Sequence, residues 1–200
     1  MKLSEAIEAV RPLMERSASR LPEGALGDKE ITAVVHRSDQ VSAGALFVAI
    51  RGARVDGHRF VGDAAARGAR AVVVEEDVDD PGDAAVIRVS DSRKALGLIS
   101  AGFYGHPADD LLMIGITGTN GKTTIAWLLE GLLAAQGFQV GVIGTINYRY
   151  DGKVFENPLT TPEASDLQRI LADMKAAGVT HVVMEVSSHG LELERVRGCS

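Results

Sequence analysis

The sequence predicts an α/β protein with parallel sheets, divided into two domains. Short apolar runs, such as Arg70 to Val74, alternate with stretches of helical periodicity. Another apolar run ends at Ile116 and passes through a loop of small residues directly into a helical pattern. Between these halves, Gly105 to Asp110 has the composition of a linker. We therefore expect a domain over residues 1–108 and the first part of a second over 109–200.

In the first domain, Ser4 is expected to cap a surface helix that runs to about Arg16. Asp91 or Ser92 can cap another helix, which runs to about Phe103. The elements expected between them are strands at 31–35, 46–50, 70–74 and 85–89, and a helix at 61–67 that Gly68 can close.

In the second domain, the segment from Lys122 to Gln136 is apolar on nearly every side and leads into the apolar run 140–143. This pattern predicts a buried βαβ unit. Asp151-Gly152 lies between two strand-like runs and predicts a hairpin. Thr160-Thr-Pro-Glu163 looks like the start of a helix, with threonine as its cap and the glutamate placed for a capping box.

That helix is expected to reach Ala177 before Gly178, and the run 180–186 should form the last strand. Only about three parallel strands are then expected after Leu111. A doubly wound nucleotide domain normally has more, so the sheet looks unfinished.

Composition excludes several classes of protein. The net charge of −6 comes without a basic block, which argues against a nucleic-acid or anionic-membrane surface. Acidic residues near the N-terminus replace the apolar core of a signal peptide, and no apolar run is long enough to cross a bilayer. We therefore expect a cytoplasmic protein without membrane insertion. The single cysteine, Cys199, excludes an internal disulfide and a cysteine-based zinc cluster.

The loop after Ile116 has the composition of a phosphate-binding loop. In this segment, backbone N–H groups and a helix N-terminus would face one anion, and Lys122 would add a positive charge. Thr123 would offer its hydroxyl to a magnesium ion that bridges phosphates. The loop is a variant, because Ile116 stands where the usual pattern has its first glycine. The alternative is a plain Gly/Asn turn. The expected nucleotide-binding residues are Gly118, Thr119, Asn120, Gly121, Lys122, Thr123 and Thr124.

Ligands of α/β sheets gather at the carboxyl ends of the strands, so the loops after Ile116, Ile143 and Val186 should share one crevice. Glu185 is then a candidate ligand of a magnesium ion that also contacts Thr123, and the alternative is a strand-end glutamate that faces solvent. His189 could ligate a second magnesium ion or bind a ligand, although a lone loop histidine usually does neither.

Three motifs, in this order, resemble the MurE branch of the Mur ligase superfamily, ligases of peptidoglycan and cell wall synthesis. They are Thr117-Gly-Thr-Asn-Gly-Lys-Thr-Thr124, Leu159-Thr-Thr-Pro-Glu163 and Met184-Glu-Val-Ser-Ser-His-Gly-Leu-Glu-Leu-Glu-Arg-Val196. Upstream, Gly44-Ala-Leu-Phe-Val-Ala-Ile50 and Asp56-Gly-His-Arg-Phe60 are similar to the uridine-binding domain of that family. The resemblance implies a small uridine-binding α/β domain followed by a phosphate-loop ATPase domain.

The resemblance also implies a reaction: ATP and Mg²⁺ activate the D-Glu carboxylate of UDP-MurNAc-L-Ala-D-Glu as an acyl phosphate, which a diamino acid attacks. Diaminopimelate is expected rather than lysine, and a monomer rather than an oligomer. Lys122 and Glu185 would be catalytic, with Thr123, Glu185 and His189 at the metal. The implied substrate-binding residues are Ser38, Thr160, Thr161, Ser187 and Arg195. Ser38 lies in the triplet Arg37-Ser-Asp39, where the family has Asp-Ser-Arg, so the flanking charges are exchanged.

Family members continue into a carbamylated lysine and a domain that binds the amino acid, so we expect these 200 residues to be the amino-terminal part of a ligase. We expect them to fold and to bind uridine nucleotides weakly, but not to form amide bonds alone. The alternatives are a sister ligase, such as MurF or a folylpolyglutamate synthase, and a non-catalytic nucleotide-binding module.

Overall fold

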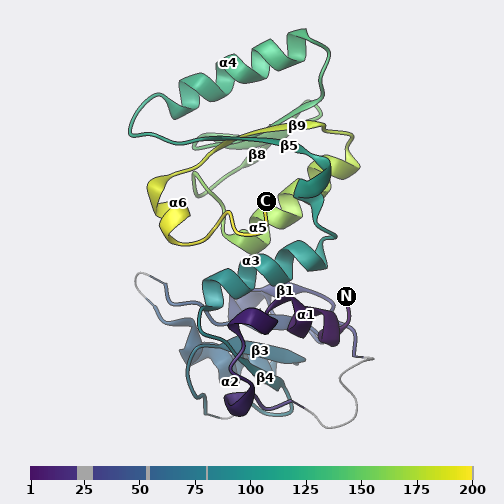
Figure 1. The fold of residues 1–200 in the computed structure, drawn as a ribbon, viewed down its shortest axis with the longest axis vertical. Coiled ribbons are helices and arrows are strands. Elements are labelled where there is room, and N and C mark those ends of the chain that lie inside the picture. The colour runs from purple at the N-terminus through teal and green to yellow at the C-terminus, as the bar shows by residue number, and fades with distance from the viewer. Residues whose placement is uncertain (22–28, 53–54, 80, 200) are drawn as a thin grey trace. The chain divides into compact units, whose positions relative to one another are not determined.

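The computed structural model describes residues 1–21, 29–52, 55–79 and 81–199. The chain forms two compact units, Met1–Phe103 and Tyr104–Ser200, each with its own parallel sheet and helices (Figure 1). Within the described ranges, no helix has both the length and the apolar character needed to span a membrane.

The first unit contains a four-stranded parallel sheet in the order β1-β2-β3-β4. Its strands are β1 (Val34–Val35), β2 (Leu46–Val48), β3 (Ala71–Val74) and β4 (Ala85–Arg88). The central strands β2 and β3 are buried along their whole length, as expected for parallel strands covered on both faces.

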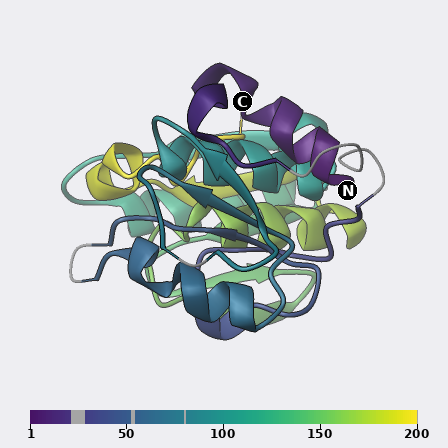
Figure 2. The ribbon, with the colours of Figure 1, turned by 90° about the horizontal axis from the view of Figure 1, so that it is seen from below.

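Helices cover both faces of this sheet. They are α1 (Leu3–Ala9), α2 (Val61–Ala66) and α3 (Ser92–Phe103). Val61 and Ala64 of α2 pack against Phe47, Val72 and Val74 on one face. On the other side, α3 contacts β1, β2, β3 and α1, and Figure 2 shows α1 and α2 on opposite sides of the sheet. The expected cap of α3 is confirmed, because the Lys94 N–H donates to Asp91 Oδ1 over 2.9 Å.

The expected first helix was too long. α1 ends at Ala9, and Arg11–Leu13 form a separate 3-10 turn. Pro12 explains the break, because proline has no N–H to donate and disfavours helical geometry in the residue before it. The cap was also wrong: Lys2 is the N-cap, and its N–H donates to Glu5 Oε2, while Ser4 lies inside the helix.

The second unit contains a five-stranded sheet in the order β5-β9-β6-β7-β8. Its strands are β5 (Leu112–Ile116), β6 (Val140–Ile143), β7 (Asn147–Tyr150), β8 (Lys153–Glu156) and β9 (His181–Glu185). β5, β9 and β6 are parallel, which confirms the three parallel strands expected. β7 and β8 form the expected hairpin, with positive φ at Asp151 and Gly152 in its turn.

The helices of this unit are α4 (Lys122–Ala135), α5 (Ala164–Ala176) and α6 (Ser188–Glu192). Alternate strand residues point to opposite faces of the sheet, and each face has a helix. Val142 and Val183 face Ala126 of α4, whereas Ile143 and Val182 face Leu167 and other residues of α5. In Figure 1, α4 and α5 accordingly lie on opposite sides of this sheet.

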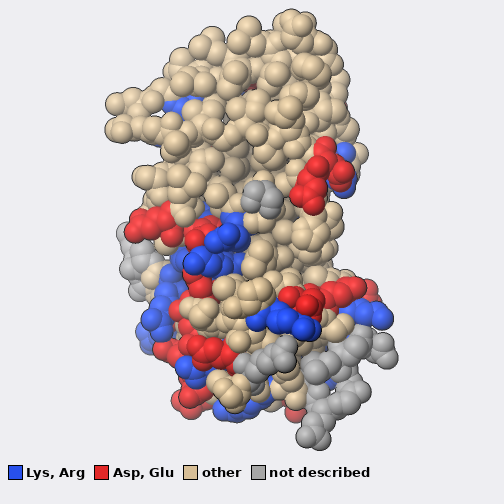
Figure 3. Space-filling view, viewed as in Figure 1, with Lys and Arg blue, Asp and Glu red and all other residues tan. Residues whose placement is uncertain are grey.

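The expectation of a buried α4 was wrong. Ala126 is its only buried residue, and Leu128 and Leu132 are 61% and 65% exposed. Among the described residues, α4 makes its main contacts with β5, β6 and β9, so its inner side is the one that the sheet covers. Charge is also rare on this helix, since α4 carries only Lys122 and Glu130. The surface over α4 in Figure 3 accordingly shows few charged atoms.

Candidate functional site

The loop between β5 and α4 has backbone geometry that requires glycine at two positions. Gly118 has φ of 144° and Gly121, the N-cap of α4, has φ of 82°. Residues with a Cβ rarely adopt these conformations. Lys122 then folds back so that Nζ donates to the Gly118 carbonyl over 2.7 Å. The loop therefore brings a positive charge and the N-terminus of a 14-residue helix to one exposed place, where both favour an anion.

Glu185, at the end of β9, lies beside this loop and is only 2% exposed. Its carboxylate accepts a hydrogen bond from Thr123 Oγ1 over 3.0 Å. Thr145, two residues after β6, donates to the same carboxylate through its hydroxyl over 2.9 Å and its N–H over 3.2 Å. The segments that follow β5 and β6 and the end of β9 therefore meet at one edge of the sheet, as the strand-end argument predicted.

Thr145 was missed in the sequence, although a signal existed. It follows the apolar strand β6 directly after Gly144, in one of the three loops expected at the crevice. The same argument that selected Glu185 could have selected this threonine. Nothing local distinguishes it from the many threonines that follow strands.

Thr160 and Thr161, in the segment before α5, also lie at this site. The Thr160 hydroxyl lies 3.1 Å from Thr145 Oγ1. Thr161 is fully buried, and its hydroxyl donates to the Glu185 carbonyl and accepts from the Ser187 N–H. Ser187 also accepts from the Gly190 N–H and so caps α6. Three of the expected substrate-binding residues, Thr160, Thr161 and Ser187, therefore lie together next to Glu185.

The capping box expected at Thr160–Glu163 was wrong. α5 begins at Ala164 with Glu163 as its N-cap, and no side-chain capping bond is made. Tertiary contacts engage these side chains instead: Thr161 bonds to the end of β9, and Glu163 pairs with Arg195 over 2.8 Å.

Arg195 was expected to contact substrate, and in this structure it is buried. Its side chain pairs with Glu163 and donates to the Thr161 carbonyl over 3.1 Å. Its Nε is buried and has no hydrogen-bond partner among the described residues. Arg195 therefore helps to fix the position of Thr161 through its backbone carbonyl. Direct contact of Arg195 with substrate stays a prediction.

His189 lies in α6, and its side chain is 62% exposed. Its Nδ1 is 3.7 Å from Glu192 Oε2, at the surface. Its role as a second metal ligand stays a prediction.

Ser38, in the first unit, lines a cavity of about 470 Å³. The cavity is lined by His36, Arg37, Ser38, Asp39, Phe47, Ile50, Gly52, Val55, Gly57 and Phe60. The Ser38 hydroxyl, followed by the Arg67 guanidinium, lowers the pKa of Asp63. Arg37 and Asp39 pair with each other over 2.7 Å, so the exchanged charges of this triplet offset one another.

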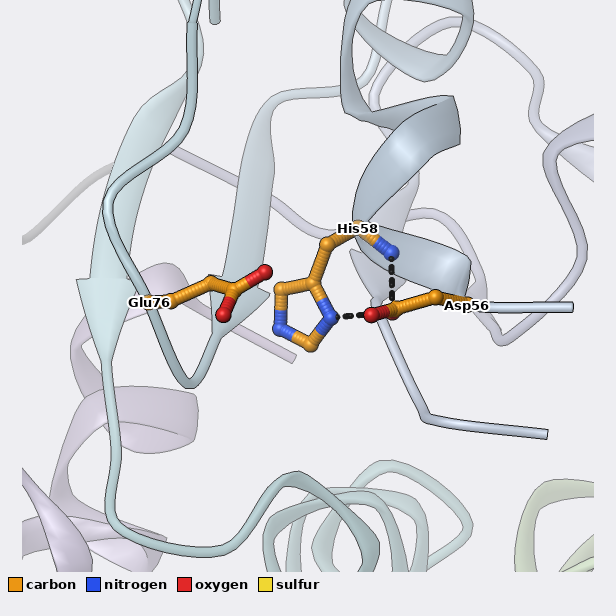
Figure 4. Close-up of side chains that lie close together, drawn as sticks. All are labelled: Asp56, His58 and Glu76. Atoms are coloured by element: carbon orange, nitrogen blue, oxygen red, sulfur yellow. Dashed lines mark hydrogen bonds and ion pairs between the residues drawn. The ribbon is translucent and has the colours of Figure 1, made fainter.

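Asp56, His58 and Glu76 lie close enough together to suggest a metal centre (Figure 4). His58 Nδ1 lies 2.6 Å from Asp56 Oδ1, and its Nε2 accepts the Glu75 N–H over 2.9 Å. Nδ1 must therefore carry the proton, and neither ring nitrogen has a free lone pair for a cation. We interpret the cluster as structural: it fixes the turn at Gly57, where a Cβ would lie 2.7 Å from the Ile50 carbonyl oxygen.

Comparison with known families gives two matches. The family described as "Mur ligase middle domain" matches residues 116–200, and "Mur ligase family, catalytic domain" matches residues 30–104. Together the two matches take in most of the chain.

Individual relatives agree with these matches. A protein from Geobacter metallireducens named UDP-N-acetylmuramoyl-L-alanyl-D-glutamate--2,6-diaminopimelate ligase is 47% identical over 85% of this chain and 33% of its own length. A solved structure of a ligase with the same name is 31% identical, with a TM-score of 0.76 over 90% of this chain and 36% of that one. A MurF ligase from Thermotoga maritima, solved in complex with ADP, is 27% identical, with a TM-score of 0.54 over 78% of this chain and 32% of that one.

The chain spans about a third of the length of the curated relatives it matches. Its two sheets, its phosphate loop and the matched segments agree on one family. The chain therefore belongs to the Mur ligase family.

Proposed function

We propose that this chain supplies the UDP-sugar-binding part and the beginning of the ATP-binding part of a ligase. The enzyme adds meso-diaminopimelate to the D-Glu of UDP-MurNAc-L-Ala-D-Glu in peptidoglycan synthesis. The γ-phosphoryl group of ATP moves to the carboxylate, and ADP leaves. The amine of the diamino acid then attacks the acyl phosphate at its carbonyl carbon, and phosphate leaves.

The observation that carries this proposal is the cluster of hydrogen bonds around Glu185. One buried carboxylate is hydrogen-bonded to Thr123 of the phosphate loop and to Thr145, and Thr145 contacts Thr160. Thr123 of the phosphate loop and Thr160, which is expected to bind the acceptor, are therefore linked by three hydrogen bonds in series. Phosphoryl transfer needs this proximity between the donor and the accepting carboxylate.

The donor set fits Mg²⁺, because a carboxylate and a hydroxyl 3.0 Å apart offer the hard oxygen ligands that this ion prefers. Thr123 and Glu185 would hold the ion, which supplies charge neutralisation at the phosphates. Lys122 and the loop N–H groups stabilise the negative charge that gathers during transfer. Thr160 and Ser187 offer hydroxyls that can orient the acceptor.

The cavity around Ser38 is proposed to receive the uridine end of the substrate. It combines apolar walls, including Phe47 and Ile50, with polar groups at Ser38 and Arg37. This composition suits a flat base with polar edges. The relatives named as diaminopimelate ligases favour that diamino acid over lysine.

The nucleotide site is tested with Lys122→Ala in the 200-residue chain, by calorimetry with Mg-ADP. We expect the variant to lose at least about tenfold in affinity, because a charge-assisted contact to phosphate disappears. Lys153→Ala is the matched control, since Lys153 is an exposed lysine at the start of β8. Equal affinity of Lys122→Ala and wild type would refute the assignment.

The acyl-phosphate step is tested in the longer protein that contains this chain, with ATP, Mg²⁺ and UDP-MurNAc-L-Ala-D-Glu. Lys122→Ala should abolish acyl-phosphate formation and leave binding of the UDP-sugar intact. Ser38→Ala should instead weaken the binding of free UDP and leave the binding of Mg-ADP unchanged. Parallel loss of both activities in either variant would show that the two sites are not separate.

A further inference from the structure

Thr145 makes three polar contacts at the site around Glu185. Its hydroxyl donates to Glu185 Oε2 over 2.9 Å, its N–H donates to Glu185 Oε1 over 3.2 Å, and its Oγ1 lies 3.1 Å from Thr160 Oγ1. Both oxygens of the buried carboxylate are therefore held by one exposed residue of the loop after β6.

These contacts fix the direction of the hydroxyl protons. An ionised carboxylate only accepts hydrogen bonds, so the single proton of the Thr145 hydroxyl is used on Glu185. Thr160 must then be the donor in its contact with Thr145. The chain of donation runs from Thr160 through Thr145 to Glu185, and it ends on the group that we propose as the metal ligand.

Gly144, the neighbour of Thr145, allows the carboxylate to come this close. A Cβ at position 144 would lie 2.4 Å from Glu185 Oε1, well inside van der Waals contact. Any larger residue at this position would push the carboxylate away from Thr145. The clash is with the tip of a flexible side chain, so the carboxylate can move without unfolding the strand.

We propose that Thr145 is a positioning residue that sets the Glu185 carboxylate for the metal and orders the hydroxyl of Thr160 through the same contact. The inference rests on the proposed nucleotide site and deepens it. Thr145 acts through its two neighbours, so its loss should affect metal binding and leave the nucleotide's own contacts with the loop unchanged.

The test measures Mn²⁺ binding to the 200-residue chain by electron paramagnetic resonance in the presence of ADP, and ADP binding without metal by calorimetry. Thr145→Val should weaken Mn²⁺ binding by about tenfold, as expected when one hydrogen bond to a charged group is lost. Metal-free ADP binding should stay within about twofold, and Thr145→Ser should restore metal binding, because the hydroxyl is regained.

Gly144→Ala is the second variant. It keeps the Thr145 hydroxyl and displaces the carboxylate, so it should reproduce the loss of Mn²⁺ binding. Thr180→Val is the control, an exposed threonine at the opposite end of β9, and it should behave as wild type.

The possible outcomes are distinguishable. Wild-type chain that binds neither ADP nor Mn²⁺–ADP would overturn the proposed nucleotide site, and this inference with it. Wild type that binds both, with Thr145→Val and Gly144→Ala indistinguishable from it, would overturn the positioning role alone. Loss of metal-free ADP binding in both variants would also overturn it, since that pattern indicates general structural damage.

Discussion

The helices α4 and α5 cover opposite faces of the same sheet, and their environments differ sharply. Seven residues of α5 are buried, whereas α4 has one. The more apolar helix is the more exposed one. The apolar composition of α4 therefore indicates how much surface the helix could bury. How much it does bury depends on the elements that pack against it.

The largest expected difference between the two helices is in core packing. Leu171 of α5 is fully buried and Leu132 of α4 is 65% exposed. We expect Leu171→Ala to lower the free energy of unfolding by about 3 kcal/mol, from lost burial and the cavity left behind. Leu132→Ala should change it by less than about 0.5 kcal/mol. Urea denaturation of the two variants measures both values. Equal losses would mean that α4 is covered in solution, for example by self-association.

The second difference is in thiol reactivity. Cys199 packs against the core on the α5 side, and burial raises the pKa of its thiol to about 11. A raised pKa leaves less of the reactive thiolate at pH 8, about a hundredfold less for each two pKa units. Cys199 should therefore react slowly with iodoacetamide, and a cysteine introduced by Leu132→Cys in a Cys199→Ala background should react fast.

The rates should also respond differently to pH. The alkylation rate of Cys199 should still be rising above pH 9, whereas that of Leu132→Cys should level off near the ordinary thiol pKa, roughly 8.5. Mass spectrometry of timed samples measures both profiles. A plateau for Cys199 below pH 9 would contradict the burial argument.

The smallest expected effect concerns two ion pairs on the α5 side of the sheet, one buried and one exposed. Glu163 and Arg195 have side chains that are 13% and 10% exposed, whereas the pair Arg169–Asp173 lies at the surface. Glu163→Gln leaves Arg195 as a poorly compensated buried charge, so we expect a loss of about 2 kcal/mol. Asp173→Asn should cost less than about 0.5 kcal/mol, because solvent screens the exposed pair. Thermal unfolding of both variants at two salt concentrations checks the contrast, and equal, salt-sensitive losses would contradict it.

Much of the fold could be predicted from local signals. The Asp151-Gly152 turn, the glycines of the phosphate loop and the Asp91 cap each depend on residues a few positions apart. The break of the first helix at Pro12 was equally local, and that signal was overlooked in the sequence.

Other features required contacts between distant segments. Thr145 and Glu185 are 40 residues apart, and Arg195 reaches the Thr161 carbonyl over 34 residues. From the local sequence, the side chains of Thr161 and Glu163 could have capped a helix. In the structure they bond to distant residues instead.

The sequence by itself determined the strand-loop-helix order, the glycine geometry of the loop and the edge of the sheet where the site lies, because backbone preferences and strand periodicity act over a few residues. Only the tertiary structure decided which hydroxyls donate hydrogen bonds to Glu185 and which side of α4 is exposed to solvent. Hydrogen bonding and burial depend on which segments meet in space, and parallel sheets bring together strand ends that are far apart in the chain.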